Sequence, residues 1–380
     1  MHKCIVCGKE LDERTHLMRI SGMPRGAQYI LTKEEVDDDR PVDLQLCQCS
    51  GCGLVQFDCE PVDYYRDVIR AGGFSSTMTQ LRRDQYKHFI ESCGLEGKKI
   101  IEIGCGQGEF LQVLGEFPVQ GFGIEHSEAL VEKARAKGLN VWKAFTETAE
   151  TELSGAPYDA FLSFNFLEHQ PDPNAMLRCI YNNLTDDGYG LITVPSLEYI
   201  LENASFYELL RDHIANYSEE TLRYLVNKNG FIVLECTRLN RDTHAMIVQK
   251  RRKVDVAGLR NNFDLLSAQM QAFLDQRIGL GKKVAVWGAS HQGFTAISTT
   301  DVADKVSYII DSAPFKQGRF APASHLPVVS PDYFFDHAVD CILIIAPGYT
   351  DEIAKTIRTR YGDAVEIAVL RSASIELYSE

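Results

Sequence analysis

The chain has 380 residues, of which 45% are hydrophobic and 24% are charged. This composition is typical of a folded globular protein with two or three domains and excludes a largely disordered chain. The formal net charge of −14, from 39 basic and 53 acidic residues, disfavours general binding to nucleic acid or anionic lipid. No apolar run is long enough to cross a membrane, and the first residues lack the apolar core of a signal peptide. We therefore expect a cytoplasmic protein that binds neither nucleic acid nor membranes.

The cysteines are concentrated at the start of the chain, which is not the distribution of a secreted disulfide scaffold. Cys4 and Cys7 form one Cys-x2-Cys pair, and Cys49 and Cys52 form a second. Two such pairs of thiolates complete a tetrahedral site that suits a structural Zn²⁺ ion, while reduced cysteines without a ligand are the alternative. Two nearby cysteines can replace a ligand but lack the pair spacing: Cys47 and Cys59. The sequence therefore predicts a small zinc-binding domain over residues 1–62.

The middle of the chain alternates between strand and helix patterns. A polar stretch at 64–80 is expected to be a linker or lid, and helical periodicity follows at 81–92. The alternation after it predicts a parallel, doubly wound α/β sheet, interrupted by an aromatic insert at 205–218. Strands are expected at 99–103, 119–125, 140–143, 158–164, 188–194 and 231–237, with helices at 108–114, 127–137, 174–184 and 219–228.

A second alternation begins after a basic break at 251–253. A long amphipathic helix is expected at 259–278, followed by further strands and helices. The strands are expected at 283–287, 306–311, 341–345 and 364–370. The expected organisation is therefore a zinc-binding domain at 1–62, an α/β domain at 63–252 and a helix-led, Rossmann-like α/β domain at 253–380.

A glycine-rich turn, Gly104-Cys105-Gly106-Gln107-Gly108, joins strand 99–103 to the helix after it. Glycines at such a turn let a ligand approach the backbone closely at a helix N-terminus. Glu102 precedes the turn, and Glu125 ends the next strand, where it can accept hydrogen bonds from ribose hydroxyls. The Gly-x-Gly-x-Gly spacing differs from that of dinucleotide enzymes and resembles class I S-adenosylmethionine (SAM) methyltransferases. A turn kept only for tight packing is the alternative.

The resemblance to SAM methyltransferases implies further contacts at the carboxyl ends of the strands. His126 would flank the adenosine or lie exposed in a turn, and Phe145 would pack on adenine or belong to the core. Asn165 follows the fourth strand, where this fold opens toward the methyl group. The implied cofactor residues are Glu102, Gly104, Gly106, Gly108, Glu125, His126, Phe145 and Asn165.

Over its full length the chain resembles the NDP-deoxysugar C-methyltransferases. The residues that carry this resemblance are Gly22-Met23-Pro24 and Cys52-Gly53-Leu54-Val55-Gln56 near the cysteine pairs, and Val286-Trp287-Gly288-Ala289-Ser290 and Asp311 with Lys316-Gln317-Gly318-Arg319 in the last third. The resemblance implies a SAM-dependent enzyme with a structural Zn²⁺ ion and a nucleotide-sugar substrate. In that family a base removes a proton beside a 4-keto group, and the resulting carbanion attacks the SAM methyl group. Histidine suits the base.

The same resemblance places candidate catalytic residues. His169 and the pair Asp212-His213 occupy positions where the family has histidines, although either histidine can also serve the structure. Tyr207 precedes the pair by one or two turns of an expected helix and would share its face. The family's tyrosine between the zinc and SAM domains is absent, because the matching segment reads Gly73-Phe74-Ser75-Ser76. The substrate-binding residues that the resemblance implies in the last domain are Gly288, His291 and Lys316.

Three other functions remain open from the sequence. The chain can be an O- or N-methyltransferase of a carbohydrate or another small metabolite, or a SAM-binding module without catalysis. An NAD(P)-linked oxidoreductase using the glycine turn at Gly288 is disfavoured, because the turn lacks the dinucleotide spacing. The expected partner is a small molecule, and the expected assembly is a monomer or a small homo-oligomer.

Overall fold

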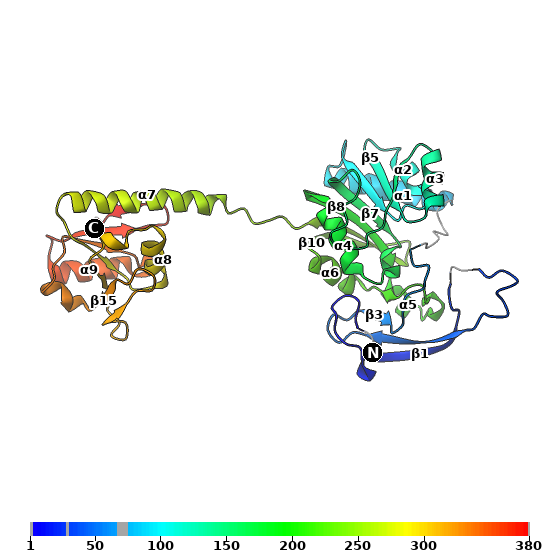
Figure 1. Ribbon diagram of the computed structural model, residues 1–380, viewed down its shortest axis with the longest axis horizontal. Helices are drawn as coiled ribbons and strands as arrows, with labels where there is room; N and C mark the ends of the chain where they lie inside the picture. Colours follow the sequence, from blue (N-terminus) through cyan, green and yellow to red (C-terminus); the bar gives the residue numbers. More distant parts are fainter. Residues whose placement is uncertain (1–2, 28–29, 67–74, 379–380) are drawn as a thin grey trace. The chain divides into compact units, whose positions relative to one another are not determined.

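The structure is a computed structural model that describes residues 3–27, 30–66 and 75–378. They belong to two compact units, Met1–Lys253 and Val254–Glu380, which we describe separately (Figure 1). Gly73 and Phe74, discussed above for a missing tyrosine, lie outside the described residues. Among the described helices, none has both the length and the apolar character that a membrane span requires. The expected α/β fold class is confirmed in both units.

The N-terminal end of the first unit forms a small antiparallel sheet whose last strand comes from far along the chain. Its order is β1-β2-β3-β9. The strands are β1 (His16–Met23), β2 (Val42–Gln48), β3 (Val55–Phe57) and β9 (Ala215–Asn216). Because β9 lies in the aromatic insert, this end of the chain is paired with the insert through backbone hydrogen bonds.

The main sheet of the first unit has the order β10-β11-β8-β7-β4-β5-β6. Strands β6, β5, β4, β7 and β8 are parallel, and β11 is antiparallel to both of its neighbours. The strands are β4 (Lys99–Ile103), β5 (Gln120–Glu125), β6 (Asn140–Lys143), β7 (Tyr158–Phe164), β8 (Leu184–Pro195), β10 (Phe231–Leu239) and β11 (Thr243–Lys250). The carboxyl ends of the parallel strands therefore meet at one edge, where this architecture binds ligands.

Helices cover both faces of this sheet, as the sequence pattern predicts. Apolar side chains of α1 (Ser76–Cys93), α2 (Glu109–Leu114) and α3 (Glu128–Ala136) pack in one buried cluster. Those of α4 (Pro173–Asn182) and α6 (Glu219–Lys228) pack in another, which also contains Cys4 and Val6. The first cysteine pair is thus anchored to the body of the unit.

The structure corrects several expected boundaries. Helix α1 begins at Ser76, not near residue 81, because the Ser75 hydroxyl accepts a hydrogen bond from the Met78 amide at 3.0 Å and caps it. Strand β11 has no counterpart among the expected elements, so the sheet is not entirely parallel. The strand expected at 306–311 is shorter, namely β13 (Ile309–Ile310).

The second unit is a seven-stranded sheet with the order β14-β15-β13-β12-β16-β17-β18, in which only the two edge strands are antiparallel. Its other strands are β12 (Val284–Trp287), β14 (Arg319–Phe320), β15 (Pro327–Val329), β16 (Cys341–Ile344), β17 (Glu366–Leu370) and β18 (Ile375–Leu377). Its helices are α7 (Ala257–Gly279), α8 (His291–Thr299) and α9 (Thr350–Tyr361). The parallel core of this sheet agrees with a second Rossmann-like fold.

Candidate active site and metal site

The glycine turn after β4 has the backbone conformation that requires glycine. Gly104, Gly106 and Gly108 have φ values of 67°, 58° and 81°. A Cβ at Gly104 would lie 3.1 Å from the Phe166 ring, and one at Gly108 would lie 2.2 Å from Leu139. These glycines keep the turn tight and leave its backbone open to a ligand.

Glu125 holds the turn from the neighbouring strand. Its carboxylate accepts hydrogen bonds from the Gly106 amide at 3.0 Å and from the Ser127 amide at 2.9 Å. The side chain is buried at the carboxyl end of β5. The carboxylate is therefore fixed beside the glycine turn, as a ribose-binding acid requires.

A small cavity of about 10 Å³ lies at this edge of the sheet. It brings together four residues singled out from the sequence, namely Gly104, Glu125, His126 and Phe145. Its full lining is Arg66, Ile103, Gly104, Ile124, Glu125, His126, Ala144, Phe145, Thr146 and Phe166. The His126 and Phe145 rings are 6.0 Å apart, edge to face. The Glu125 carboxylate, the two rings and the glycine turn therefore meet at the carboxyl ends of β4 and β5.

Arg66 is a lining residue that sequence reasoning missed. Its guanidinium lies 5.3 Å from the Phe145 ring centroid and also pairs with Glu147. Arg66 belongs to the stretch that was expected to be a linker, and no motif marks it.

Four implied cofactor residues lie outside the lining of this cavity, namely Glu102, Gly106, Gly108 and Asn165. Glu102 is fully buried within β4. Asn165 follows β7 with a φ of 47°, and its side-chain oxygen accepts a hydrogen bond from the Thr193 hydroxyl at 2.9 Å. Asn165 therefore fixes the turn at the carboxyl end of β7.

His169 and His213 lie together although they are far apart in the sequence. Their ring centroids are 4.7 Å apart, with nearly perpendicular planes. His169 Nδ1 lies 2.8 Å from the carbonyl oxygen of Asp212, and because a carbonyl only accepts, this nitrogen donates. The Nε2 atom of His169 is consequently left as the ring's proton acceptor.

Burial controls the protonation of this pair and of the neighbouring Glu168. It lowers the pKa of His169 to about 4, against the opposing hydrogen bond to Asp212. It lowers the pKa of His213 to about 3, with a further lowering by His169 and an opposing effect of Asp212. Burial also raises the pKa of Glu168 to about 8. At neutral pH both imidazoles are therefore neutral, although they are weaker bases than a group titrating near neutrality.

Asp212 joins this group, whereas Tyr207 does not. Asp212 is 2% exposed, and its carboxylate accepts hydrogen bonds from the Ala27 amide at 2.7 Å and the Tyr64 hydroxyl at 2.8 Å. Tyr207 is 66% exposed and lies on a short 3-10 helix that ends at Glu208. No helix continues from Tyr207 to His213, so the expectation of a shared helical face is wrong.

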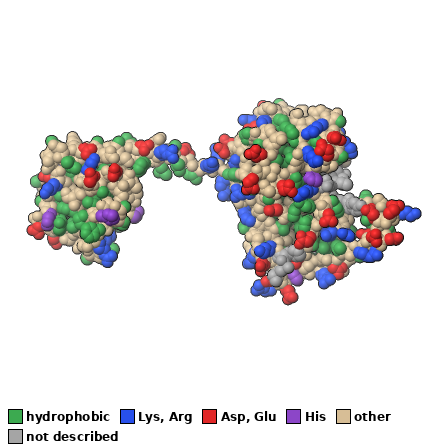
Figure 2. Space-filling model, viewed as in Figure 1, with side chains coloured by type: hydrophobic (Ala, Val, Ile, Leu, Met, Phe, Trp, Pro, Cys, Tyr) green, Lys and Arg blue, Asp and Glu red, His purple; other side chains and the backbone are tan. Residues whose placement is uncertain are grey.

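A second cavity, of about 630 Å³, lies beside the Tyr64–Asp212 contact. Its lining comprises Pro24, Arg25, Gly26, Leu31, Glu34, Glu35, Asp38, Asp39, Val62, Asp63, Tyr64 and Arg211. Carboxylates outnumber the two arginines, and Figure 2 shows acidic side chains gathered on the loop between β1 and β2. An acidic wall of this kind suits the hydroxyl groups of a neutral ligand better than a diphosphate.

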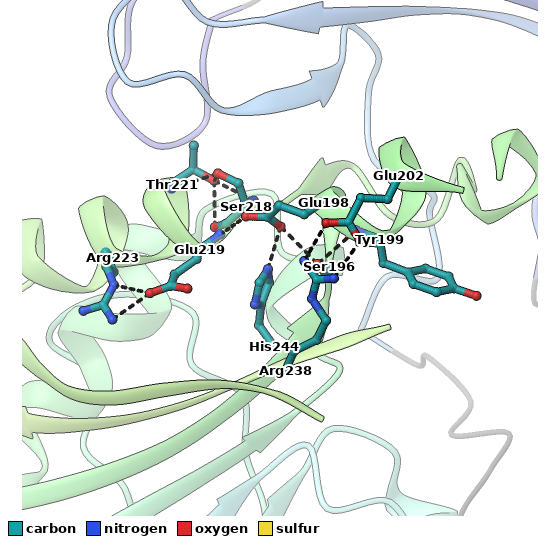
Figure 3. Close-up of polar contacts among 10 residues, drawn as sticks. All are labelled: Ser196, Glu198, Tyr199, Glu202, Ser218, Glu219, Thr221, Arg223, Arg238 and His244. Carbon is teal, nitrogen blue, oxygen red and sulfur yellow. Dashed lines mark hydrogen bonds and ion pairs between the residues drawn. The ribbon is translucent and has the colours of Figure 1, made fainter. Parts of the chain in front are cut away.

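The insert that carries Asp212 and His213 is anchored at both ends by one polar network (Figure 3). Glu198 on α5 (Leu197–Glu202) accepts hydrogen bonds from the Ser196 hydroxyl at 3.0 Å and the Glu219 amide at 2.8 Å. The His244 ring on β11 lies 2.7 Å from the same carboxylate. Ser218 caps α6 with a capping box through Thr221. The insert therefore starts and ends at fixed points on the main sheet.

The four cysteines of the two pairs meet in space. The Sγ atoms of Cys4 and Cys52 are 3.5 Å apart, those of Cys7 and Cys49 are 3.4 Å apart, and all four lie within 4.8 Å of one another. These separations fit thiolates around one tetrahedral ion with metal–sulfur bonds of about 2.3 Å. Four sulfur ligands leave no open position on such an ion.

The second unit contains its own glycine turn, after β12. Gly288 has a φ of 127°, and a Cβ there would lie 2.5 Å from the Ile345 carbonyl oxygen. The Ala289 amide and the Lys316 ammonium both donate to the Asp311 carboxylate, at 3.0 and 2.9 Å. His291 is exposed at the start of α8. Lys316 is thus paired with Asp311, while His291 faces solvent.

Comparison with known proteins matches the two units separately. Residues 78–235 match the methyltransferase domain family, and residues 250–367 match the C-methyltransferase C-terminal domain family. The C-methyltransferase NovU of Streptomyces niveus is 22% identical over 92% of this chain and 91% of its own length. A ubiquinone biosynthesis O-methyltransferase of Pseudomonas fluorescens is 29% identical, but only over 26% of this chain and 44% of its own length. Magnesium protoporphyrin IX methyltransferase from Synechocystis, solved with bound SAH, covers 50% of this chain at 15% identity with a TM-score of 0.39.

Proposed function

We propose, from the premise that this chain belongs to the SAM-dependent C-methyltransferases, that it methylates a carbon beside the 4-keto group of an NDP-linked deoxysugar. One observation carries the proposal, namely the buried pair His169–His213 with Asp212 in the same unit as the glycine turn. Transfer to an oxygen or nitrogen does not require a base that removes a proton from carbon. The match to a C-methyltransferase over nearly the whole chain supports the same choice.

The side chains of this chain would divide the reaction as follows. SAM, when bound, supplies an electrophilic methyl group. Gly104, Glu125 and Phe145 would orient it at the end of the parallel strands. His213, neutral at neutral pH, would take the proton from the carbon beside the ketone and hold it as the carbon–carbon bond forms. The neighbouring Asp212 favours the protonated imidazole, because opposite charges attract.

The sugar half of the acceptor would bind in the acidic cavity beside Tyr64, because its hydroxyls can donate to carboxylates. The diphosphate is unsuited to that cavity, because its charge has the same sign as the carboxylates of the lining. The substrate contacts that the sequence predicts at Gly288, His291 and Lys316 of the second unit stay a prediction, and the Lys316 ammonium is paired with Asp311.

We also propose that the four-cysteine group holds a structural Zn²⁺ ion. The donor set and the separations of the sulfur atoms support this assignment. The Asn174 side chain donates to the carbonyls of Ile5 and Val6, so that a filled site would lock the N-terminal end onto α4. The ion would take no part in the chemistry.

The test is incubation of the purified chain with SAM and a panel of NDP-4-keto-deoxysugars, followed by mass spectrometry. We expect one sugar to gain a methyl group on carbon. In deuterated water without SAM, the same sugar should exchange the proton at that carbon. Matched NDP-sugars with a 4-hydroxyl group in place of the ketone serve as controls and should not react. Methylation of a hydroxyl or amine without prior exchange at carbon would overturn the proposal.

A further inference from the structure

Asp212 is held by two segments that precede the SAM-binding part of the chain. The Tyr64 hydroxyl donates to one carboxylate oxygen at 2.8 Å, and the Ala27 amide donates to the other at 2.7 Å. With a 2% exposed side chain, these two donors replace the water that the carboxylate would otherwise bind. The position of Asp212 therefore depends on residues outside its own insert.

The packing around Tyr64 is closely fitted. A Cβ at Gly26 would lie 2.2 Å from the Tyr64 hydroxyl oxygen, so that any larger residue there would displace the end of the Tyr64 side chain. The Arg211 guanidinium donates to the Arg25 carbonyl and joins the same loop to the residue before Asp212. The loop that carries Arg25 and Ala27 therefore contacts the insert at the same place as Tyr64.

The backbone of Asp212 connects its fixed side chain to the two histidines. Its carbonyl oxygen accepts from His169 Nδ1 at 2.8 Å, and the His169 ring lies 4.7 Å from that of His213. The backbone of Asp212 therefore selects the tautomer of His169 and keeps its Nε2 unprotonated. A carboxylate displaced at Asp212 would move this carbonyl as well.

We propose that Tyr64 is a positioning residue for the histidine pair, acting through Asp212. The proposal rests on the proposed function for its catalytic meaning, but the geometry it describes does not depend on which acceptor is methylated. No motif in the sequence marks Tyr64, and the family tyrosine near residue 73 is absent here. A hydrogen bond to a charged carboxylate is stronger than one between neutral groups, and a buried carboxylate has no water to replace it, so this bond can hold the insert in one arrangement.

The decisive readout is the nitrogen-15 NMR spectrum of the imidazoles in the full chain with labelled histidine. In the wild type we expect His169 to give the signals of a single Nδ1-protonated tautomer, assigned by their loss in His169→Asn. In Tyr64→Phe we expect those signals to move toward values averaged over both tautomers. Tyr199→Phe is the matched control, because this hydroxyl points away from the polar network in Figure 3. A folded Tyr64→Phe chain with unchanged His169 signals would overturn the proposal.

A second variant, Gly26→Ala, tests the same contact without changing Tyr64 itself. Gly26→Ala pushes on the Tyr64 hydroxyl from the other side and should reproduce the spectral change. Thermal unfolding and metal content identify any variant that has not folded. With an NDP-4-keto-sugar found to react, kcat of Tyr64→Phe should fall about 10- to 100-fold while the KM for SAM stays within about twofold. If no sugar reacts, the proposed function fails, whereas the NMR result still decides the role of Tyr64.

Discussion

The Gly106 amide donates to the Glu125 carboxylate at 3.0 Å, which joins the glycine turn after β4 to the end of β5. The carboxylate also accepts from the Ser127 amide, so both of its oxygens face backbone donors. A SAM ribose that binds here meets a carboxylate already fixed in place. Little conformational freedom is lost on binding, because the site is formed in advance.

Glu125→Gln should weaken SAM binding about tenfold or more while leaving the chain folded. The amide has only one acceptor oxygen, so that one backbone N–H would face an N–H₂ group instead. Isothermal titration calorimetry with SAM measures the change. Glu128→Gln removes the same charge from an exposed ion pair with Lys143 and serves as control. Equal SAM affinity in both variants would contradict the assignment of Glu125.

His213→Asn should lower turnover by about 10²- to 10⁴-fold, the usual contribution of a general base. SAM affinity should remain within about twofold, because His213 does not line the cavity beside Gly104, Glu125 and Phe145 where SAM is proposed to bind. His88→Asn, at an exposed pair with Glu235, should retain full turnover. If His213→Asn loses SAM binding together with turnover, His213 serves the structure and another group is the base.

Glu168 should make the free energy of unfolding depend on pH well above the range in which a glutamate usually titrates. Its pKa is raised by burial from 4.5 to about 8 in the folded chain, so its contribution is complete below about pH 4.5 and is lost as pH rises through 8. Glu168→Gln cannot ionise, so its Tm should gain on that of the wild type between pH 5 and pH 8.5. Differential scanning calorimetry at these two values tests this. The exposed Glu208→Gln should run parallel to the wild type, and parallel curves for Glu168→Gln would refute the prediction.

Cys52→Ser should lower both the zinc content and the Tm of the first unit. Loss of the Cys52 thiolate leaves three ligands, so that both the binding of the ion and the stability gained from it should fall. Atomic emission spectroscopy gives the metal content, and circular dichroism gives the Tm. Cys59→Ser is the control, because Cys59 is not part of the four-cysteine group. If the Cys52→Ser chain still binds one zinc ion, Cys52 is not a ligand of that ion.

The sequence predicts those parts of the site that depend on local backbone conformation. The glycine turn and Glu125 are recognisable because positive φ and the end of a strand leave short-range patterns. Contacts between distant segments leave no such pattern. Tyr64 meets Asp212 across 148 residues, and β9 is too short to carry a periodicity. The prediction for Tyr207 is wrong for the same reason. Tyr207 and His213 are close in the sequence, but no continuous helix joins them.

The pairing of β9 with β3 has a consequence for synthesis on the ribosome. The cysteine-bearing segment emerges before the insert, so the edge of β3 stays unpaired until Ala215 and Asn216 have left the exit tunnel. An exposed strand edge is a place where nascent chains associate with one another. Early binding of a metal ion by the four cysteines would limit this risk, because it would order their segment before β9 is available to pair with β3. A fragment that stops before the insert should accordingly aggregate, even though it contains every cysteine of the cluster.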